Sequence, residues 1–239
     1  MSDLEIIATS LQDALLIAKG GADRIELVSA LSEGGLTPSY DLMQQVISAV
    51  DIPVNVMIRP HSASFVYDEA DLQRMIADIE HAKACGANGV VLGMLTVEGM
   101  VDLPALERLL AYCDGLEVTF HRAIDATAEA AEAADILAAT RVIAATPVRR
   151  VLSSGGGSGH AEDNLATLRQ MQTILSAQGK ALLVGGGVNR LNCRKILQAT
   201  GAPELHVGTS VRERHSAHGA INLAAVQELV TQLSDWGQV

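Results

Sequence analysis

The chain has 239 residues, a formal net charge of −11 at pH 7, 49% hydrophobic residues and only 3% aromatic residues. This acidic balance argues against a nucleic-acid partner, because phosphate backbones are bound by clustered Lys and Arg. No run approaches the ~18 apolar residues of a membrane span, and the N-terminal residues lack the basic start and apolar core of a signal peptide. We therefore expect a soluble, cytoplasmic protein without a membrane partner.

The three cysteines do not indicate a metal or disulfide framework. Cys85, Cys113 and Cys193 are far apart in the sequence and contain no Cys-x-x-Cys pair. Each falls in a helical pattern, where a small buried thiol is the usual explanation. We expect neither a disulfide nor a structural zinc site.

Eight short segments have the composition of buried strands, and segments with helical periodicity separate them. The strand segments are residues 4–8, 24–28, 54–58, 89–92, 116–120, 150–153, 181–184 and 204–207. Between the fifth and sixth segments, an Ala-rich stretch from about Ala126 predicts one long helix that ends near Pro147. This count and length predict an α/β fold, the (β/α)₈ TIM barrel, as a single domain over residues 1–239. The competing doubly wound sheet more often has five or six strands.

Polar and apolar residues alternate along several of these strands. In the fifth, Val118 and Phe120 lie on one face, and Thr119 and His121 lie on the other. Since helices cover the outside of such a barrel, the apolar face meets the helices and the polar face points to the barrel axis. The same rule places further polar residues at the axis: Glu5, Arg24, Glu26, Asn55, Arg59, Glu117 and His206.

Two interpretations of this polar set remain open. One is an ion-pair network that fills the barrel, with Arg24 and Arg59 neutralising three acidic groups, Glu5, Glu26 and Glu117. The other is a functional site, because Arg59, His121 and Arg122 lie at the carboxyl ends of strands, where the active sites of barrels are found. Charged groups near the amino ends would then serve stability, and those near the carboxyl ends would serve function.

Glycine-rich segments follow the last three strands. Residues 153–159 read SSGGGSG, residues 185–188 read GGGV, and residues 208–210 read GTS. Each alone is also typical of a tight turn, but barrels commonly bind phosphate in the loops after strands seven and eight, through backbone N–H groups. We expect an anion or phosphate subsite formed by Ser154, Gly155, Gly156, Gly186, Gly187, Gly208, Thr209 and Ser210.

Seven short motifs resemble those of the copper homeostasis protein CutC family and together span most of the chain. They are ADRIEL at 22–27, EGGLTP at 33–38, MIRP at 57–60, GANG at 86–89, TFHRA at 119–123, RVLSSG at 150–155 and GGGV at 185–188. The resemblance implies a cytoplasmic TIM barrel that forms a homodimer. The family's name implies a role in copper handling.

The chain departs from this family at two positions that bear on copper. Family members often carry a cysteine where this chain has Ile7 and another where it has Val28. Since Cu(I) prefers thiolate and thioether ligands, we expect no metal site and no cofactor. The remaining copper alternative combines His121 with a methionine: Met57, Met94 or Met100.

Two hypotheses about function follow. In the first, the chain is a lyase or isomerase for a phosphorylated or otherwise anionic small molecule. Glu26 and His121 would then move protons, and Arg59 and Arg122 would balance the developing charge. In the second, the chain is a Cu(I)-binding protein of copper homeostasis without turnover. The two missing cysteines favour the first.

Overall fold

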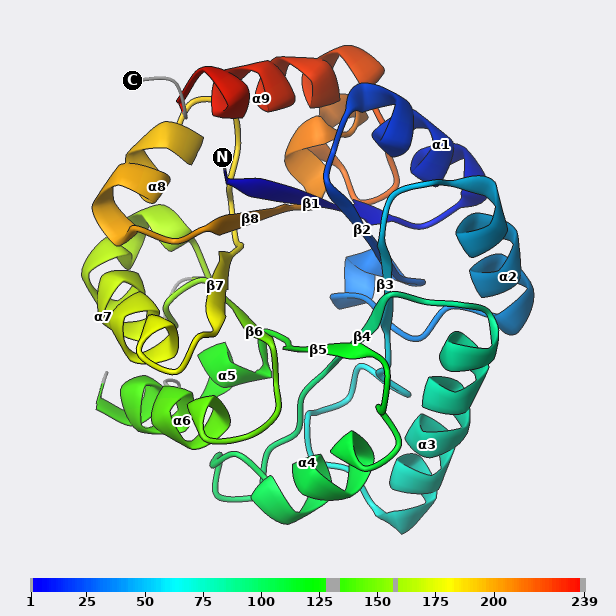
Figure 1. Ribbon diagram of the computed structural model, residues 1–239, viewed down its shortest axis with the longest axis vertical. Helices are drawn as coiled ribbons and strands as arrows, with labels where there is room; N and C mark the ends of the chain where they lie inside the picture. The colour runs from blue at the N-terminus through cyan, green and yellow to red at the C-terminus, as the bar shows by residue number, and fades with distance from the viewer. Residues whose placement is uncertain (1, 128–133, 157–158, 237–239) are drawn as a thin grey trace.

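The computed structural model describes residues 2–127, 134–156 and 159–236, which form one closed parallel barrel (Figure 1). Neighbouring strands in the barrel are neighbours in the chain, and β8 pairs with β1 to close it. The strands are β1 (Asp3–Ala8), β2 (Arg24–Leu27), β3 (Val54–Met57), β4 (Gly89–Leu92), β5 (Glu117–Phe120), β6 (Arg150–Ser153), β7 (Ala181–Val184) and β8 (Glu204–Val207). The predicted fold class is confirmed.

The helices form a ring around the barrel (Figure 1). They are α1 (Leu11–Gly20), α2 (Tyr40–Ala49), α3 (Glu69–Ala84), α4 (Leu103–Leu110), α5 (Ala123–Ala126), α6 (Ala134–Ala144), α7 (Leu165–Ser176), α8 (Cys193–Thr200) and α9 (Leu223–Trp236). Where the sequence predicts one Ala-rich helix, the structure has α5 and α6, and residues 128–133 between them lie outside the described residues. Among the described helices, none combines the length and apolar character needed to cross a membrane.

Local sequence signals set where these helices begin and end. The side chain of Ser10 accepts a hydrogen bond from the backbone N–H of Asp13 and so caps the first turn of α1. Gly21 ends the same helix in the left-handed region, with φ 89°, which glycine adopts without a steric penalty. Asp68 and Asp71 form a capping box at the start of α3. These caps set where α1 begins and ends and where α3 begins.

The apolar faces of the strands pack against the helices, as the alternation predicts. Val118 is 3% exposed and Phe120 is fully buried, and both belong to the main hydrophobic cluster between the barrel and its helices. Burial of a side chain of this size stabilises the fold by roughly 1.5–3 kcal/mol. The side chains at the alternate strand positions therefore point into the barrel interior, and most of them are polar.

Candidate functional site

The interior has a lower layer in which charged groups are paired. It consists of Glu5, Arg24, Glu117, Arg150 and Glu204, of which the last four are the first residues of their strands. Arg24 donates to Glu5 and to Glu204, each at 2.5 Å. Arg150 donates to Glu117 at 2.6 Å and to Glu204 at 3.0 Å. A buried carboxylate or guanidinium is tolerated only with such partners, so this layer is structural.

The ion-pair interpretation of the sequence is therefore right for Arg24 and wrong for Arg59. Arg59 pairs with none of the predicted carboxylates, and Glu117 instead pairs with Arg150. The register explains the difference, because Met57 aligns with Val91 and Val91 aligns with Thr119. Arg59 is thus level with His121, which lies four positions beyond Glu117, or roughly 13 Å further along the strand direction.

Above this layer, a cavity of about 270 Å³ opens at the carboxyl ends of the strands, and we call it the mouth. All four residues predicted to be catalytic line it: Glu26, Arg59, His121 and Arg122. Four of the predicted anion-binding residues line it as well: Gly186, Gly187, Gly208 and Thr209. The structure thus brings these eight predicted site residues to one cavity.

Glu26 is the least compensated acid in the interior. It is 2% exposed, and its Oε1 has no hydrogen-bond partner among the described residues. Burial raises the pKa of Glu26 to about 7; His206 opposes this rise, and the neighbouring Glu5 adds to it. The carboxyl group can therefore gain and lose a proton near neutral pH, as a general acid or base requires.

His206 connects Glu26 to the paired layer. Its Nδ1 lies 2.8 Å from Glu5 Oε1, and its Nε2 lies 3.8 Å from Glu26 Oε2. Although burial opposes it, Arg24 and His206 hold the pKa of Glu5 at about 2, so Glu5 is an ionised acceptor and His206 Nδ1 donates to it. Burial also opposes a charged His206, but Glu26 and Glu5 raise its pKa.

His121 is held as a neutral imidazole with a fixed tautomer. The backbone N–H of Ala123 donates to His121 Nδ1 at 3.1 Å, so the ring proton is on Nε2. Burial and the charge of Arg59 lower the pKa of His121 to about 3. The ring packs on Gly93, where an added Cβ would lie 2.5 Å from Nδ1. Nε2 has no partner among the described residues, so it is a donor available to a ligand.

Arg59 is positioned without a carboxylate. Its guanidinium donates to the carbonyl oxygens of Glu33 at 3.1 Å and Gly35 at 3.2 Å, and it lies 4.7 Å from the ring centroid of Phe65. Its Nε has no partner among the described residues. A guanidinium held by carbonyls and a ring keeps its full positive charge, which an anionic ligand at the mouth would neutralise.

The glycine-rich loop after β6 differs from its predicted role. The carboxylate of Asp125 accepts from the backbone N–H groups of Ser154 and Gly156 and from the hydroxyl of Ser154. The N–H of Gly155 donates to Ser153 Oγ, and Gly155 and Gly156 are buried. An internal carboxylate therefore takes the donors expected for a bound anion. Gly157 and Ser158 lie outside the described residues.

Arg122 is tied to the same cluster. Its Nε donates to Asp125 at 2.8 Å and a terminal nitrogen donates to Ser154 Oγ at 3.0 Å, while its side chain is 43% exposed. It borders the mouth, but its Nε is already engaged with Asp125 and a terminal nitrogen with Ser154 of the β6 loop. We therefore expect Arg122 to contribute less than Arg59 to the positive potential at the mouth.

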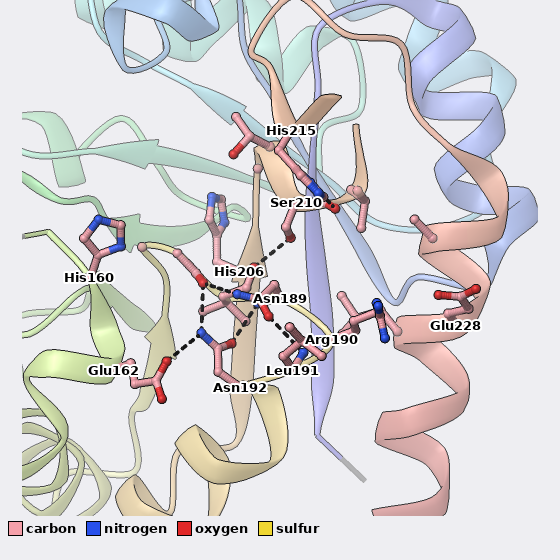
Figure 2. Close-up of a pocket in the computed structure, with 18 of the residues that line it drawn as sticks. His160, Glu162, Asn189, Arg190, Leu191, Asn192, His206, Ser210, His215 and Glu228 are labelled. Carbon is pink, nitrogen blue, oxygen red and sulfur yellow. Dashed lines mark hydrogen bonds between the residues drawn. The ribbon is translucent and has the colours of Figure 1, made fainter. Parts of the chain in front are cut away.

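A second and larger cavity, of about 730 Å³, lies between the β7 and β8 loops and α9 (Figure 2). It shares Gly186, Gly187, Gly208 and Thr209 with the mouth. Ser210, the remaining residue predicted to bind the anion, lines the larger cavity but not the mouth. Its hydroxyl donates to Val188 O at 2.7 Å. The β7 and β8 loops thus line the cavities, whereas Ser154, Gly155 and Gly156 of the β6 loop line neither of them.

Of the three methionines considered for copper, only Met57 shares a cavity with His121. Ile7 and Val28 pack with Met57 in a small apolar cluster inside the barrel. Met94 is buried in the outer core and Met100 is 62% exposed. Met57 and His121 therefore offer one thioether and one imidazole at the mouth, whereas Met94 and Met100 lie away from it.

One other group has metal-like spacing. Ligand atoms of Glu5, Glu26 and His206 lie within 4.8 Å of one another. However, Glu5 and one nitrogen of His206 are already engaged with Arg24 and with each other. The pair that remains is short of the three protein ligands of a typical open catalytic zinc site.

Several residues that shape this site could not be assigned from the sequence. Arg150 and Glu204 carry a weak signal, since their strand parity is that of the inward-facing residues. His206 is noted on parity, yet its link between Glu5 and Glu26 is not apparent from spacing. Asp125 carries no such signal, because it lies in a short helix and contacts a loop about 30 residues away.

Comparison with known proteins places the chain among close relatives. The model of the CutC family matches residues 2–211. A human protein named copper homeostasis protein cutC homolog is 41% identical over 204 residues, covering 85% of this chain and 71% of that protein. A crystal structure of the copper homeostasis protein CutC from Streptococcus agalactiae has a TM-score of 0.80 and 32% identity, covering 87% of this chain and 99% of that one.

The fold is also similar to that of more distant barrels. The N-(5'-phosphoribosyl)anthranilate isomerase from Pyrococcus furiosus has a TM-score of 0.65 at 15% identity, covering 98% of this chain and 100% of that one. At this identity the similarity concerns the barrel alone.

Proposed function

The chain belongs to the CutC family, and from this premise we propose that its barrel mouth binds an anionic small molecule and carries out acid–base chemistry of the lyase or isomerase type. The observation that carries the proposal is the state of Glu26, a buried carboxyl group with an unpartnered oxygen and a pKa of about 7. It shares its cavity with two donors that also have unpartnered nitrogens, His121 and Arg59.

These groups suit proton abstraction next to a carbonyl group. Glu26 as a carboxylate takes the proton from the carbon, and negative charge develops on the carbonyl oxygen. The neutral Nε2–H of His121 and the guanidinium of Arg59 stabilise that charge by hydrogen bonding. Glu26 then returns the proton to a different atom for an isomerase, or a leaving group departs for a lyase. Such acid–base catalysis contributes typically 10²–10⁴-fold to rate.

The anion subsite is proposed at four residues of the β7 and β8 loops, Gly186, Gly187, Gly208 and Thr209, which we call the glycine ridge. Gly187 and Thr209 are exposed, and Gly186 is half-buried with φ 95°, which brings the backbone itself to the cavity wall. The positive charge of Arg59 at the same mouth adds to the attraction for an anion. We also propose that the protein acts in the cytoplasm as a homodimer.

The alternative, direct Cu(I) binding, is supported by the names of relatives, which refer to copper homeostasis. The local chemistry favours the small-molecule proposal, because the cluster of Ile7, Val28 and Met57 offers a single thioether and no thiolate.

Hydrogen exchange tests the acid–base proposal without requiring the natural substrate. The protein is incubated in D₂O with a panel of phosphorylated aldehydes and ketones, and loss of the α-proton is followed by NMR. We expect exchange for at least one compound, and a loss of about 100-fold or more in Glu26→Gln. Glu80→Gln is the matched control, since Glu80 is an exposed residue of α3 away from both cavities. Equal exchange rates in both variants would contradict the assignment of Glu26.

Thermal unfolding tests the anion subsite. Phosphate at a hundredfold excess over its Kd would stabilise the folded protein by about 2.7 kcal/mol, so it should raise the Tm more than chloride at equal ionic strength. Thr209→Glu should remove the phosphate-specific shift, because it places a negative charge on the ridge. Thr231→Glu, an exposed position on α9, should keep it. Gly186→Val is unsuitable, since a Cβ there would lie 2.3 Å from Gly159 O.

A further inference from the structure

The mouth and the larger cavity meet along the glycine ridge. Five residues line both cavities: Gly186, Gly187, His206, Gly208 and Thr209. Apart from His206, these are the ridge residues proposed to bind the anion. An anion bound at the ridge would therefore lie between two cavities rather than at the end of one.

The β7 side of the ridge is held in place by its own contacts. Gly186 O accepts from the N–H of Ala161 at 2.9 Å. Gly187 O accepts from the amides of Asn189 and Asn192 at 2.9 and 3.0 Å (Figure 2). Because a trans peptide directs its C=O and the following N–H to opposite sides, the N–H groups that follow these carbonyls point away from those partners. No acceptor for the N–H of Gly187 is present among the described residues.

The two cavities differ in size in a way that matters for the ligand. The mouth, at about 270 Å³, is just below the ~300–1,000 Å³ usual for small-molecule pockets, whereas the larger cavity, at about 730 Å³, lies well inside that range. The mouth suits a small reacting group, and most of the available space lies on the other side of the ridge.

The larger cavity offers both donors and acceptors to a neutral polar group. His215 Nδ1 lies 3.2 Å from Ser210 O, and since a carbonyl only accepts, Nδ1 donates to it and Nε2 is left for a ligand. Arg190 and Glu228 bring opposite charges to the wall (Figure 2). Glu162, also on the wall, forms an ion pair with Lys195 at 2.6 Å. A wall with mixed charges and hydrogen-bonding groups suits the hydroxyl groups of a sugar.

We propose that the ligand of this protein carries its phosphate in the middle, with the reacting group in the mouth, the phosphate on the glycine ridge and a hydroxyl-bearing group in the larger cavity. This inference rests on the proposed function, since it uses the same anion subsite. The class of ligand is a phosphodiester or a diphosphate with organic groups on both sides. A simple phosphomonoester would fill the mouth and leave the larger cavity empty.

The test compares three probes by calorimetry: inorganic phosphate, ribose 5-phosphate and ADP-ribose, which extends ribose 5-phosphate through a diphosphate to a second sugar. We expect ADP-ribose to bind at least tenfold more tightly than ribose 5-phosphate. His215→Asn should remove this advantage and leave the affinity for ribose 5-phosphate unchanged. Asn is chosen because His215 has φ 50°, which Asn tolerates better than most residues. His218→Ala, in the same loop but outside the cavity wall, is the control.

The outcomes separate this inference from the proposed function. If ribose 5-phosphate binds and ADP-ribose binds no more tightly, the bridging arrangement is wrong and the anion site stands. Equal losses for both probes in His215→Asn would also overturn the bridging arrangement. If none of the three probes binds, the anion subsite itself fails, and the inference fails with it.

Discussion

The lower layer of the barrel interior and the mouth are built from the same kinds of side chain but differ in how these are paired. Arg24 and Arg150 in the lower layer each contact two carboxylates at 2.5–3.0 Å. In the mouth, Glu26, Arg59 and His121 each keep an atom without a partner among the described residues. The buried charges of the lower layer are paired with each other, whereas Glu26 and Arg59 in the mouth are incompletely paired, and we propose that a ligand supplies the missing partners.

The difference also appears in the two interior acids on β1 and β2. Arg24 and His206, acting against burial, hold the pKa of Glu5 at about 2, and burial raises the pKa of Glu26 to about 7. A carboxyl group that is permanently ionised stabilises its cationic partners, and one that titrates near neutral pH can transfer protons. Neighbouring strands thus place a structural acid and a candidate catalytic acid within one barrel.

The largest expected effect is on stability, at the lower layer. Glu204→Leu leaves Arg24 and Arg150 with one carboxylate each in a buried setting, and we expect the free energy of unfolding to fall by about 3 kcal/mol or more. Chemical denaturation measures it. Glu204→Gln, which keeps the shape and an acceptor oxygen, should cost less. A loss below about 1 kcal/mol for the Leu variant would show that the lower layer does not depend on this pairing.

A smaller effect, of the opposite sign, is expected at the mouth. The pKa of Glu26 is about 7 in the folded protein and near 4.5 in the unfolded chain. The contribution of this carboxyl group to the free energy of unfolding is therefore complete below pH 4.5, and it is lost as the pH rises through about 7. Glu26→Gln stays neutral, so at pH 8 it should be more stable than the parent protein, by on the order of 1–3 kcal/mol. At pH 4 the two should be equal.

The groups that face Glu26 define the control for this pH dependence. They are His206 from β8, Glu5 from β1 and Arg24 from its own strand. Glu5→Gln removes an ionised partner of Arg24, so it should lower stability at pH 8, where Glu26→Gln raises it. Destabilisation by both variants at pH 8 would show that the mouth is as fully paired as the lower layer.

The smallest expected effect concerns copper. The parent protein should bind Cu(I) no better than dispersed Met and His side chains do, because Ile7 and Val28 offer no thiol beside Met57. Titration against a competing Cu(I) chelator measures the affinity. The double variant Ile7→Cys, Val28→Cys should bind more tightly, since it adds two thiols to that cluster. Stoichiometric binding by the parent protein at sub-nanomolar free Cu(I) would restore copper as the ligand.

Much of the barrel could be predicted because its signals are local. The short apolar composition of the strand segments identifies the strands to within one residue, and the period-2 alternation in several of them gives the inward-facing set, including Glu26 and His121. The choice of ion-pair partners could not be predicted, since it depends on register. Arg59 and Glu117 have the same inward parity, but the stagger of the strands separates them along the axis.

The glycine loops show a second limit of sequence analysis. Three similar segments predict three similar anion-binding loops, yet the donors after β6 are taken by Asp125 and those after β7 and β8 line the cavities. The segments themselves do not encode this difference, because the carboxylate comes from the preceding strand–helix unit. Glycine content indicates where a backbone can bind an anion, and only the structure shows whether a side chain already occupies that place.

The most direct test of the contrast between the two layers is a carboxyl NMR titration of the protein labelled with ¹³C at its glutamate side chains. We expect Glu26 to titrate at about pH 7 and Glu5 at about pH 2, with the assignments made from Glu26→Gln and Glu5→Gln. If Glu26 instead titrates near its ordinary value of 4.5, its carboxyl group is compensated within the protein, and the mouth has no acid poised for proton transfer.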